Sequence, residues 1–236
     1  MQHFRGMTIQ WVGHATFHLE TAQGTSILID PWTESNPACP KDWQAPKKID
    51  LVLCTHGHSD HIGDALAIEE KYHPTFVAMN ELAAWLTSKG VKTAVGMNLG
   101  GSYRFQDVMV AMVPASHSSG INDDGAMVYG GEPAGYVIQV DGEPVLYHAG
   151  DTALFSDMKL ICDLYAPEIA CLPIGDHYTM GPRAAAIAAE YVGIKKVIPI
   201  HYGTFPVLTG TPEELRKYLQ GKPVDVLEMH PGERLA

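Results

Sequence analysis

Hydrophobic residues along the chain follow two periods, one typical of β-strands and one typical of amphipathic helices. Short apolar runs that end at Gly, Pro, Asp or Asn predict strands. Apolar residues three and four positions apart, such as Leu82, Trp85 and Leu86, predict helices. The predicted strands cover residues 8–12, 15–20, 26–29, 49–54, 75–79, 102–105, 108–114, 136–140, 144–148, 169–174, 196–200 and 224–229, and the predicted helices cover residues 62–72, 81–89, 158–165, 184–191 and 212–220.

The order of these elements is similar in the two halves of the chain, because hairpins alternate with strand–helix units in each half. We therefore expect one domain, residues 1–236, with an α/β (α+β) fold: a four-layer αββα sandwich in which two sheets lie face to face and helices cover them. Residues 31–48, with four prolines and two tryptophans, and the Gly-rich residues 121–131 are expected to be loops. The first loop is either a lid over a functional site or a segment packed on the surface.

Four potential metal ligands fall within six residues, directly after the predicted strand 49–54. They are His56, His58, Asp60 and His61, in the spacing H-x-H-x-D-H. Side chains alternate along an extended backbone, so His56 and His58 can face the same way. Asp60 and His61 lie at the turn into a helix and can converge on a second point. Two such clusters in one loop are what a two-metal site requires, and a His-rich loop without metal is the alternative.

Three further candidate ligands, His117, Asp151 and His201, follow apolar strands later in the chain. Taken singly each is a weak candidate: His117 is more typical of a surface histidine and Asp151 of a turn residue, and His201 could be a core histidine. Strand ends that converge on one rim are where sites form, so together with the first motif they predict a binuclear centre. One division places His56, His58 and His117 around one metal, Asp60, His61 and His201 around the other, and Asp151 between them.

The ligand types restrict the metal to a few ions. Imidazole and carboxylate groups suit zinc, manganese, iron or nickel. We expect two divalent ions, zinc or manganese in first place and iron or nickel as alternatives. Such a pair can hold a hydroxide between its ions as a nucleophile at neutral pH.

These motifs, together with Asp30 at the end of an early strand, resemble the metallo-β-lactamase superfamily. The resemblance covers essentially the whole chain, and every metal-ligand position of the family is filled. Residues 11–17, 147–152 and 172–182 are similar to its uncharacterised metal-dependent hydrolase branch, which is similar to ascorbate-6-phosphate lactonase. The resemblance implies the αββα metallo-β-lactamase-like fold, a binuclear metal site and hydrolase activity. It also implies that Asp30 orients the site loops and does not bind metal.

Further histidines are candidates for roles around the metals. His148 precedes Asp151 by three residues and is expected to support the site through hydrogen bonds, which metal-bound groups usually need. His14 is a candidate for the same kind of role. His177 begins a loop before a helix and could donate a proton to a leaving group. For each, a loop histidine without a role is the alternative. The candidate catalytic residues are Asp60, Asp151 and His177.

Composition and charge restrict the kinds of binding partner and the cellular compartment that we expect for this protein. The net charge of −11 repels a phosphate backbone, so nucleic-acid binding is not expected. The four cysteines show no C-x-x-C spacing, and there is no signal-peptide pattern and no apolar run of about 20 residues for a membrane helix. We expect a cytoplasmic protein with a small-molecule substrate and no membrane partner. Oligomeric state is not predicted.

The sequence thus favours a metal-dependent hydrolase whose bridging hydroxide attacks a small anionic ester, either a lactone or a phosphoester. The alternative is an iron-dependent oxidoreductase of the dioxygenase type on the same fold. A nuclease is disfavoured by the net charge and by the lack of an inserted domain or basic arm, and a non-catalytic scaffold by the complete ligand set.

Overall fold

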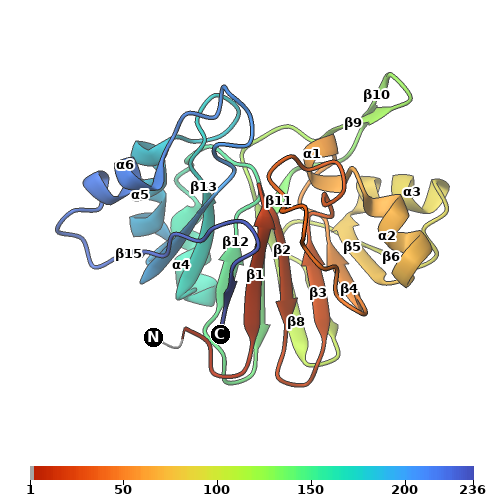
Figure 1. The fold of residues 1–236 in the computed structure, drawn as a ribbon, viewed down its shortest axis with the longest axis horizontal. Helices are drawn as coiled ribbons and strands as arrows, with labels where there is room; N and C mark the ends of the chain where they lie inside the picture. Colours follow the sequence, from red (N-terminus) through yellow and green to blue (C-terminus); the bar gives the residue numbers. More distant parts are fainter. Residues whose placement is uncertain (1–2) are drawn as a thin grey trace.

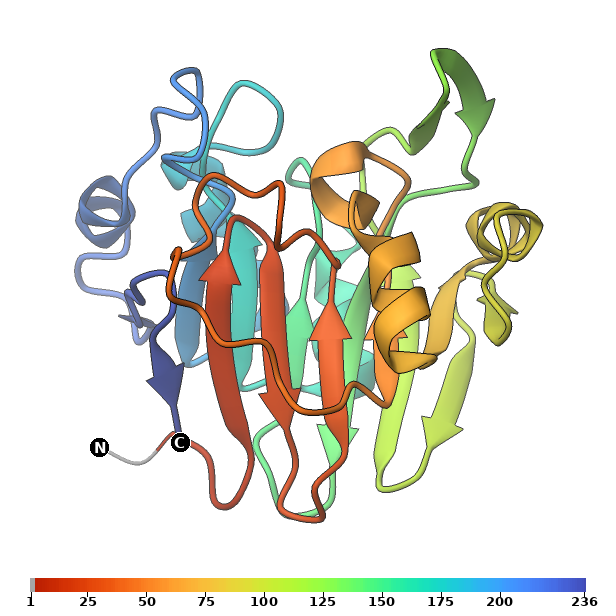
Figure 2. The ribbon, with the colours of Figure 1, turned by 45° about the vertical axis from the view of Figure 1, so that its right-hand side comes forward.

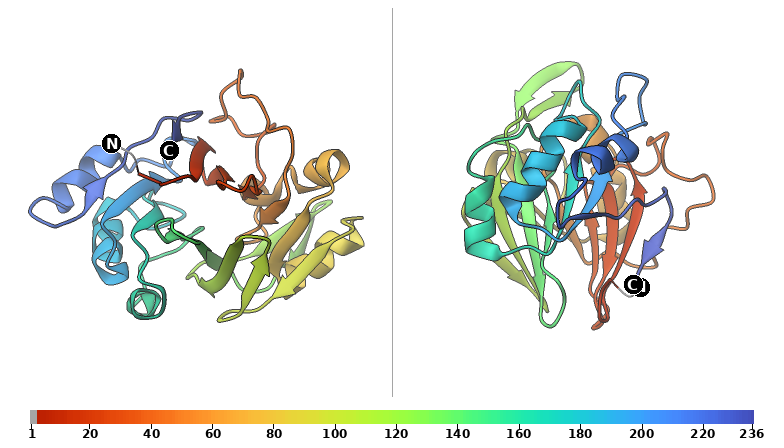
Figure 3. Two further views of the ribbon diagram at one scale, coloured as in Figure 1. Left: turned by 90° about the horizontal axis from the view of Figure 1, so that it is seen from below. Right: turned by 90° about the vertical axis from the view of Figure 1, so that its left-hand side faces the viewer.

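Two β-sheets lie face to face, with helices on their outer sides, in the computed structural model, which describes residues 3–236 (Figures 1 and 3). The main apolar core includes Phe17 and Tyr136 between the sheets, and it extends to Ile68 and Leu86 on the helices that cover the first sheet. A second apolar cluster, which includes Val137 and Ala188, lies between the second sheet and its helices. Neighbouring residues such as Tyr136 and Val137 enter different clusters because side chains alternate along a strand. The αββα sandwich is therefore confirmed.

The first sheet joins an antiparallel part to a parallel part. Its first three strands in chain order pair antiparallel, and the following strands run parallel to the third. The last strand of the chain pairs antiparallel with the first, so the two ends of the chain lie side by side (Figure 1). The strand order is β16 (Arg234–Leu235), β1 (Thr8–Gly13), β2 (Thr16–Glu20), β3 (Ser26–Ile29), β4 (Leu51–Leu53), β5 (Thr75–Met79) and β6 (Ala94–Met97).

The second sheet has the same plan. Its four strands at one edge run parallel, and the rest pair antiparallel. This repetition agrees with the two similar halves expected from the sequence. The strand order is β15 (Asp225–Val226), β14 (Lys196–Ile200), β13 (Ile169–Pro173), β12 (Leu146–His148), β11 (Ala134–Val140), β8 (Val108–Pro114) and β7 (Ser102–Phe105).

Helices from the first half of the chain lie beside the first sheet, and those from the second half lie beside the second (Figure 1). The last helix begins with one half of the predicted capping box: Thr211 Oγ1 accepts a hydrogen bond from the Glu214 backbone N–H at 3.2 Å, and the Glu214 carboxylate faces the Thr211 hydroxyl at 3.5 Å. The helices are α1 (Ser59–Ile62), α2 (Ala65–Tyr72), α3 (Asn80–Ser88), α4 (Met158–Tyr165), α5 (Pro182–Val192) and α6 (Pro212–Tyr218).

Several segments differ from the prediction. Strand β16 was not predicted, and the helix predicted over residues 62–72 is divided into α1 and α2. Residues 121–131 were expected to be a loop, but they contain most of a hairpin of β9 (Gly120–Asp123) and β10 (Ala126–Tyr129), which projects from the molecule in Figure 1. Its turn is Asp124-Gly125, with φ of 51° and 87°, the conformation that favours Asp-Gly in two-residue hairpins. Strand β6 was not predicted, because its four residues include a glycine and form no uninterrupted apolar run, which agrees with their partial exposure in the structure. The predicted strand 224–229 is reduced to the two residues of β15.

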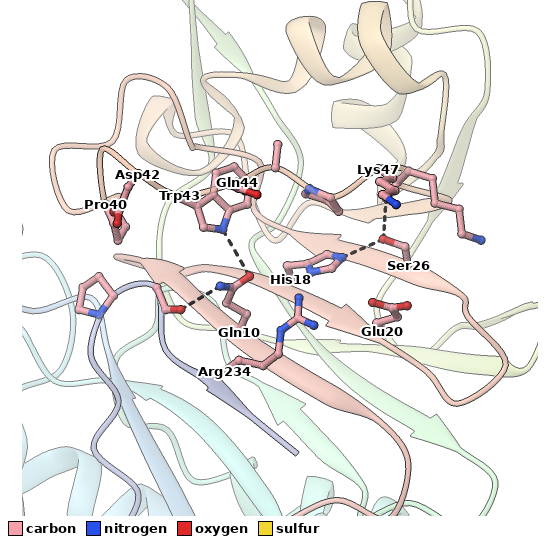
Figure 4. Close-up of a pocket in the computed structure, with 15 residues that line it drawn as sticks. Gln10, His18, Glu20, Ser26, Pro40, Asp42, Trp43, Gln44, Lys47 and Arg234 are labelled. Atoms are coloured by element: carbon pink, nitrogen blue, oxygen red, sulfur yellow. Dashed lines mark hydrogen bonds between the residues drawn. The ribbon is translucent and has the colours of Figure 1, made fainter.

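The proline-rich segment 31–48 runs over the outer side of β1, β2 and β3 (Figure 2). The indole N–H of Trp43 donates to Gln10 Oε1 on β1 at 3.4 Å (Figure 4). A cavity of about 900 Å³ beneath it is lined by basic and acidic side chains, among them Lys47, Arg234 and Asp42. Most of this segment therefore packs on the surface of the sheet, which was one of the two alternatives predicted for it. Only its beginning reaches the site described below.

Two buried tyrosines give a test of the packing between the sheets. The Tyr136 hydroxyl on β11 donates toward the carbonyls of Cys54 (2.9 Å) and Val77 (3.1 Å) in the first sheet, whereas the buried Tyr147 hydroxyl has no hydrogen-bond partner within residues 3–236. We predict that Tyr136→Phe lowers the free energy of unfolding by about 1–2 kcal/mol, because a bond between the sheets is lost. Tyr147→Phe is the matched control and should be neutral or stabilising. Urea denaturation measures both, and equal losses would contradict the account.

Candidate metal centre

The seven predicted ligands come from one edge of the two sheets. His56, His117 and Asp151 each lie three residues beyond a strand, after β4, β8 and β12, and His201 directly follows β14. Asp60 and His61 lie on the short helix α1 at the upper edge in Figure 1. Because these strand ends meet at one edge, side chains from distant parts of the sequence gather there.

The ligand atoms fall into overlapping groups in which all atoms lie within 4.8 Å of one another. Asp151 is central. Its Oδ1 lies 3.4 Å from His61 Nε2, and its Oδ2 lies 3.0 Å from His201 Nε2 and 3.5 Å from His117 Nε2. The groups are His56, His58 and His117; His56, His61 and Asp151; and His14, Asp60, His61 and His201. One group is the predicted set His56, His58 and His117, and another contains Asp60, His61 and His201 together with His14, so the division into two metal sites stays a prediction.

The chemistry of these atoms fits metal ions. His61 Nε2, His201 Nε2 and Asp151 Oδ1 are buried, and although the imidazole nitrogens lie 3.0–3.4 Å from Asp151 oxygens, none of the three atoms makes a well-aligned hydrogen bond within residues 3–236. Buried polar atoms are nearly always paired, so such a cluster requires another partner. His56 Nε2 and His58 Nδ1 also face each other at 2.9 Å, where a shared proton or a shared cation is needed between them. Imidazole nitrogens and carboxylate oxygens around one space are suitable ligands for divalent transition metals.

A buried carboxylate, Asp30, sets the orientation of two of these imidazoles. Its oxygens accept from the Thr55 backbone N–H (2.8 Å), the Thr55 hydroxyl (2.8 Å) and His61 Nδ1 (2.7 Å). The Thr55 hydroxyl gives its proton to Asp30, so it accepts from His56 Nδ1 at 3.0 Å. Both histidines therefore carry a proton on Nδ1 and direct Nε2 at the centre. Although burial opposes it, the neighbouring Asp151 and Asp30 raise the pKa of His61 well above its ordinary value, so His61 Nε2 also carries a proton, which a bound cation would displace. The predicted orienting role of Asp30 agrees with these contacts.

Burial and neighbouring charge act in opposite directions on the ligands. Burial lowers the pKa of His56 well below its ordinary value, so this imidazole is neutral, as a ligand must be. Burial by itself would raise the pKa of the Asp151 carboxyl, but the neighbouring His201 and His61 hold it well below its usual range. Asp151 is therefore ionised at neutral pH and is available to neutralise a cation.

His14 lies closer to the predicted ligands than the sequence indicated. Its Nε2 is 3.1 Å from Asp60 Oδ2, and its Nδ1 is 2.9 Å from Thr204 Oγ1. An ionised carboxylate only accepts, so Nε2 donates to Asp60 and the Thr204 hydroxyl donates to Nδ1. Burial lowers the pKa of His14 to about 4, which leaves one ring proton at pH 7. His14 thus orients Asp60, and movement of this proton to Nδ1 would free Nε2 as a further ligand beside His61 and His201.

His148 supports the site through the backbone. Its Nε2 donates to the Ala15 carbonyl at 3.0 Å, and its Nδ1 accepts from the Gly150 N–H at 3.2 Å. Gly150 has φ of 60°, and a Cβ there would come within 2.8 Å of the Thr55 side chain. His148 therefore holds the turn that carries Asp151, and it is not a member of the three ligand groups found within residues 3–236.

His177 is not brought into the cluster. Its side chain is exposed, its backbone N–H donates to Asp176 Oδ1 at 2.8 Å, and its ring lies 4.5 Å from that of Tyr178. Tyr178, which the sequence reading did not single out, lines the cavity beside the ligands. The role of His177 as a proton donor stays a prediction.

The cavity over the ligands is about 650 Å³ in volume and has walls that the sequence reading missed. Ser59 begins α1, and the other side chains stand in loops after β3, β8, β13 and β14. For the apolar ones, an apolar residue in such a loop was the available signal. The missed residues are Trp32, Ser59, Ser118, Tyr178, Phe205 and Val207. Within residues 3–236, no helix is both long and apolar enough to span a bilayer.

Comparison with known proteins identifies the class. Residues 25–202 match the family model described as the beta-lactamase superfamily domain. The chain is 56% identical over 229 residues to a UPF0173 metal-dependent hydrolase of Koribacter versatilis, covering 97% of each chain, and 45% identical over 231 residues to one of Methanopyrus kandleri, covering 96% of this chain and 98% of that one. It therefore belongs to the UPF0173 metal-dependent hydrolases of the β-lactamase superfamily, and it is an enzyme of that hydrolase class.

Solved structures agree with this assignment. Igni18, described as a novel metallo hydrolase from Ignicoccus hospitalis, superposes with a TM-score of 0.86 at 38% identity, with 97% of both chains covered. An isothiocyanate hydrolase from Delia radicum gut bacteria superposes with a TM-score of 0.73 at 20% identity, covering 97% of this chain and 98% of that one. The second likeness shows the fold alone.

The orienting carboxylate gives a prediction. Asp30→Asn introduces an amide N–H₂ group where Thr55 and His61 require acceptors, so the two imidazoles lose their fixed tautomer. We predict that zinc affinity falls about 10- to 100-fold, the usual effect of losing such a partner. Chelator competition measures the affinity. Asp50→Asn is the matched control, because Asp50 accepts from the Ser26 backbone N–H in the same sheet and is no member of the ligand groups. Equal affinities in the two variants would refute the role of Asp30.

Proposed function

We propose that this metal-dependent hydrolase acts on a small ester with an anionic transition state, either a lactone or a phosphoester, at a binuclear centre. The observation that carries the proposal is the position of Asp151, whose two oxygens approach histidines of both predicted sites. A carboxylate placed in this way can bridge two cations. Two bound divalent ions, zinc or manganese, would supply a Lewis acid and a hydroxide nucleophile at neutral pH.

Residues around the centre hold the side chains of the predicted metal ligands in a fixed geometry. Asp30 fixes His61 directly and His56 through Thr55, and His14 fixes Asp60. Because these contacts exist before a substrate arrives, little reorganisation is required when negative charge develops on the ester oxygen. The cavity over the ligands is large enough for a small molecule and is the space in which we propose that the ester binds.

Reporter hydrolysis tests the proposal. Protein loaded separately with zinc and with manganese is assayed with a phosphodiester and with a lactone. We expect turnover of at least one reporter by the wild type and none by Asp151→Ala, because that variant loses the central carboxylate. Asp141→Ala, at an exposed turn distant from the ligand groups, is the control and should retain full activity. Unchanged turnover in Asp151→Ala contradicts the binuclear proposal. Oxygen consumption by iron-loaded protein, without ester hydrolysis, would favour the oxidoreductase.

A second variant tests the expected proton donor. His177 is exposed, and its neighbour Tyr178 lines the cavity. We propose that the His177 imidazole donates a proton to the leaving group of a substrate bound in this cavity. We predict that His177→Ala lowers turnover of a reporter with a poor leaving group and leaves metal content unchanged. A reporter with a good leaving group, which needs no acid, should be hydrolysed normally. Equal effects on both reporters would remove His177 from this role.

A further inference from the structure

The walls of the cavity over the ligands differ chemically from its floor. The floor contains predicted ligands, among them Asp60 and Asp151. Of the described residues that line this cavity, none is a lysine or an arginine. A charged substituent that packed against this lining would therefore lose solvent without gaining a counter-charge, which is costly.

Four side chains form what we call the apolar wall: Trp32, Tyr178, Phe205 and Val207. They come from three loops, after β3, β13 and β14. The ring centroids of Trp32 and Phe205 lie 6.0 Å apart, and the indole N–H of Trp32 already donates to Ser35 Oγ at 2.7 Å. The indole thus has no donor left for a ligand and offers an apolar surface.

The wall is also held in place and partly open to solvent. The loop that carries Phe205 and Val207 is closed by backbone hydrogen bonds from Gly203 to Leu208 (3.2 Å) and from Leu208 to Phe205 (3.0 Å). Val207 remains 42% exposed, although a branched aliphatic side chain gains by burial. An apolar group of a bound ligand would cover it.

We propose that the substrate of this centre carries an uncharged apolar substituent, alkyl or aryl, that packs on the apolar wall while its ester group meets the metals. The inference rests on the proposed function and narrows it. It favours esters with a hydrocarbon portion and disfavours sugar phosphates, whose second anionic group would have only the wall to contact.

Binding of alkylphosphonates tests the inference without turnover. Zinc-loaded protein is titrated calorimetrically with ethyl-, butyl- and hexylphosphonate and with 5-carboxypentylphosphonate. Each methylene that becomes buried should tighten binding roughly three- to fourfold, so hexylphosphonate should bind at least about tenfold more tightly than ethylphosphonate. The carboxylate analogue should bind no more tightly than ethylphosphonate, because its charge would be desolvated.

Variants at the exposed edge of the wall locate the effect. Val207→Ser should reduce the ratio of hexylphosphonate to ethylphosphonate affinity at least about threefold, because one methylene-sized contact contributes about that factor. Val207→Lys should make 5-carboxypentylphosphonate bind more tightly than hexylphosphonate, because the introduced ammonium can pair with the carboxylate. Leu164→Ser is the matched control, since Leu164 is an exposed aliphatic residue on α4, outside the cavity lining. It should keep the wild-type ratio.

The two proposals fail in different ways. Absence of phosphonate binding, equal affinity for all chain lengths, or unchanged ratios in both Val207 variants overturns the apolar wall. Chain-length dependence in binding together with no hydrolysis of either reporter supports the wall and contradicts the proposed ester hydrolysis.

Discussion

The arrangement of the metal centre depends on one buried carboxylate. Asp30 lies at the end of β3 with a φ of 50°, fully buried, and its two oxygens accept three hydrogen bonds from Thr55 and His61. Through these bonds it joins β3 to the loop after β4 and fixes the tautomers of His61 and His56. A carboxylate is suited to this position because it only accepts, so every donor around it has a defined direction.

Unfavourable local backbone conformations surround the same centre. His14, Asp30 and His201 all have positive φ, which is uncommon for residues with a side chain, and Gly150 has it where a Cβ would strike Thr55. Such conformations let a strand turn sharply and direct the next side chain inward. The two packed sheets provide the free energy that keeps these turns in place, since their cores of apolar residues extend to the same edge.

The chemistry of the cavity is divided between its floor and its walls. Charge and hydrogen bonding gather at the floor, around Asp151, while the apolar wall of Trp32, Tyr178, Phe205 and Val207 lies beside it. A reaction that develops negative charge is therefore matched by the metal-binding floor alone. We infer that the apolar wall selects among esters, because it presents an apolar surface with few polar groups to the rest of the substrate. Reactivity and specificity are thus carried by different loops, the motif loop in the first case and the loops after β3, β13 and β14 in the second.

The candidate ligands and most of the strands and helices can be predicted from the sequence alone, because strand and helix periods and the H-x-H-x-D-H spacing are local properties of the chain. The Asp124-Gly125 pair is likewise a local signal for the β9–β10 turn. The sequence does not show that His14 reaches Asp60, that His148 donates to the Ala15 carbonyl, that His177 stays outside the cluster or which side chains form the apolar wall. These relations join residues far apart in sequence, and they arise only when the packing of two sheets brings the strand ends to a common edge.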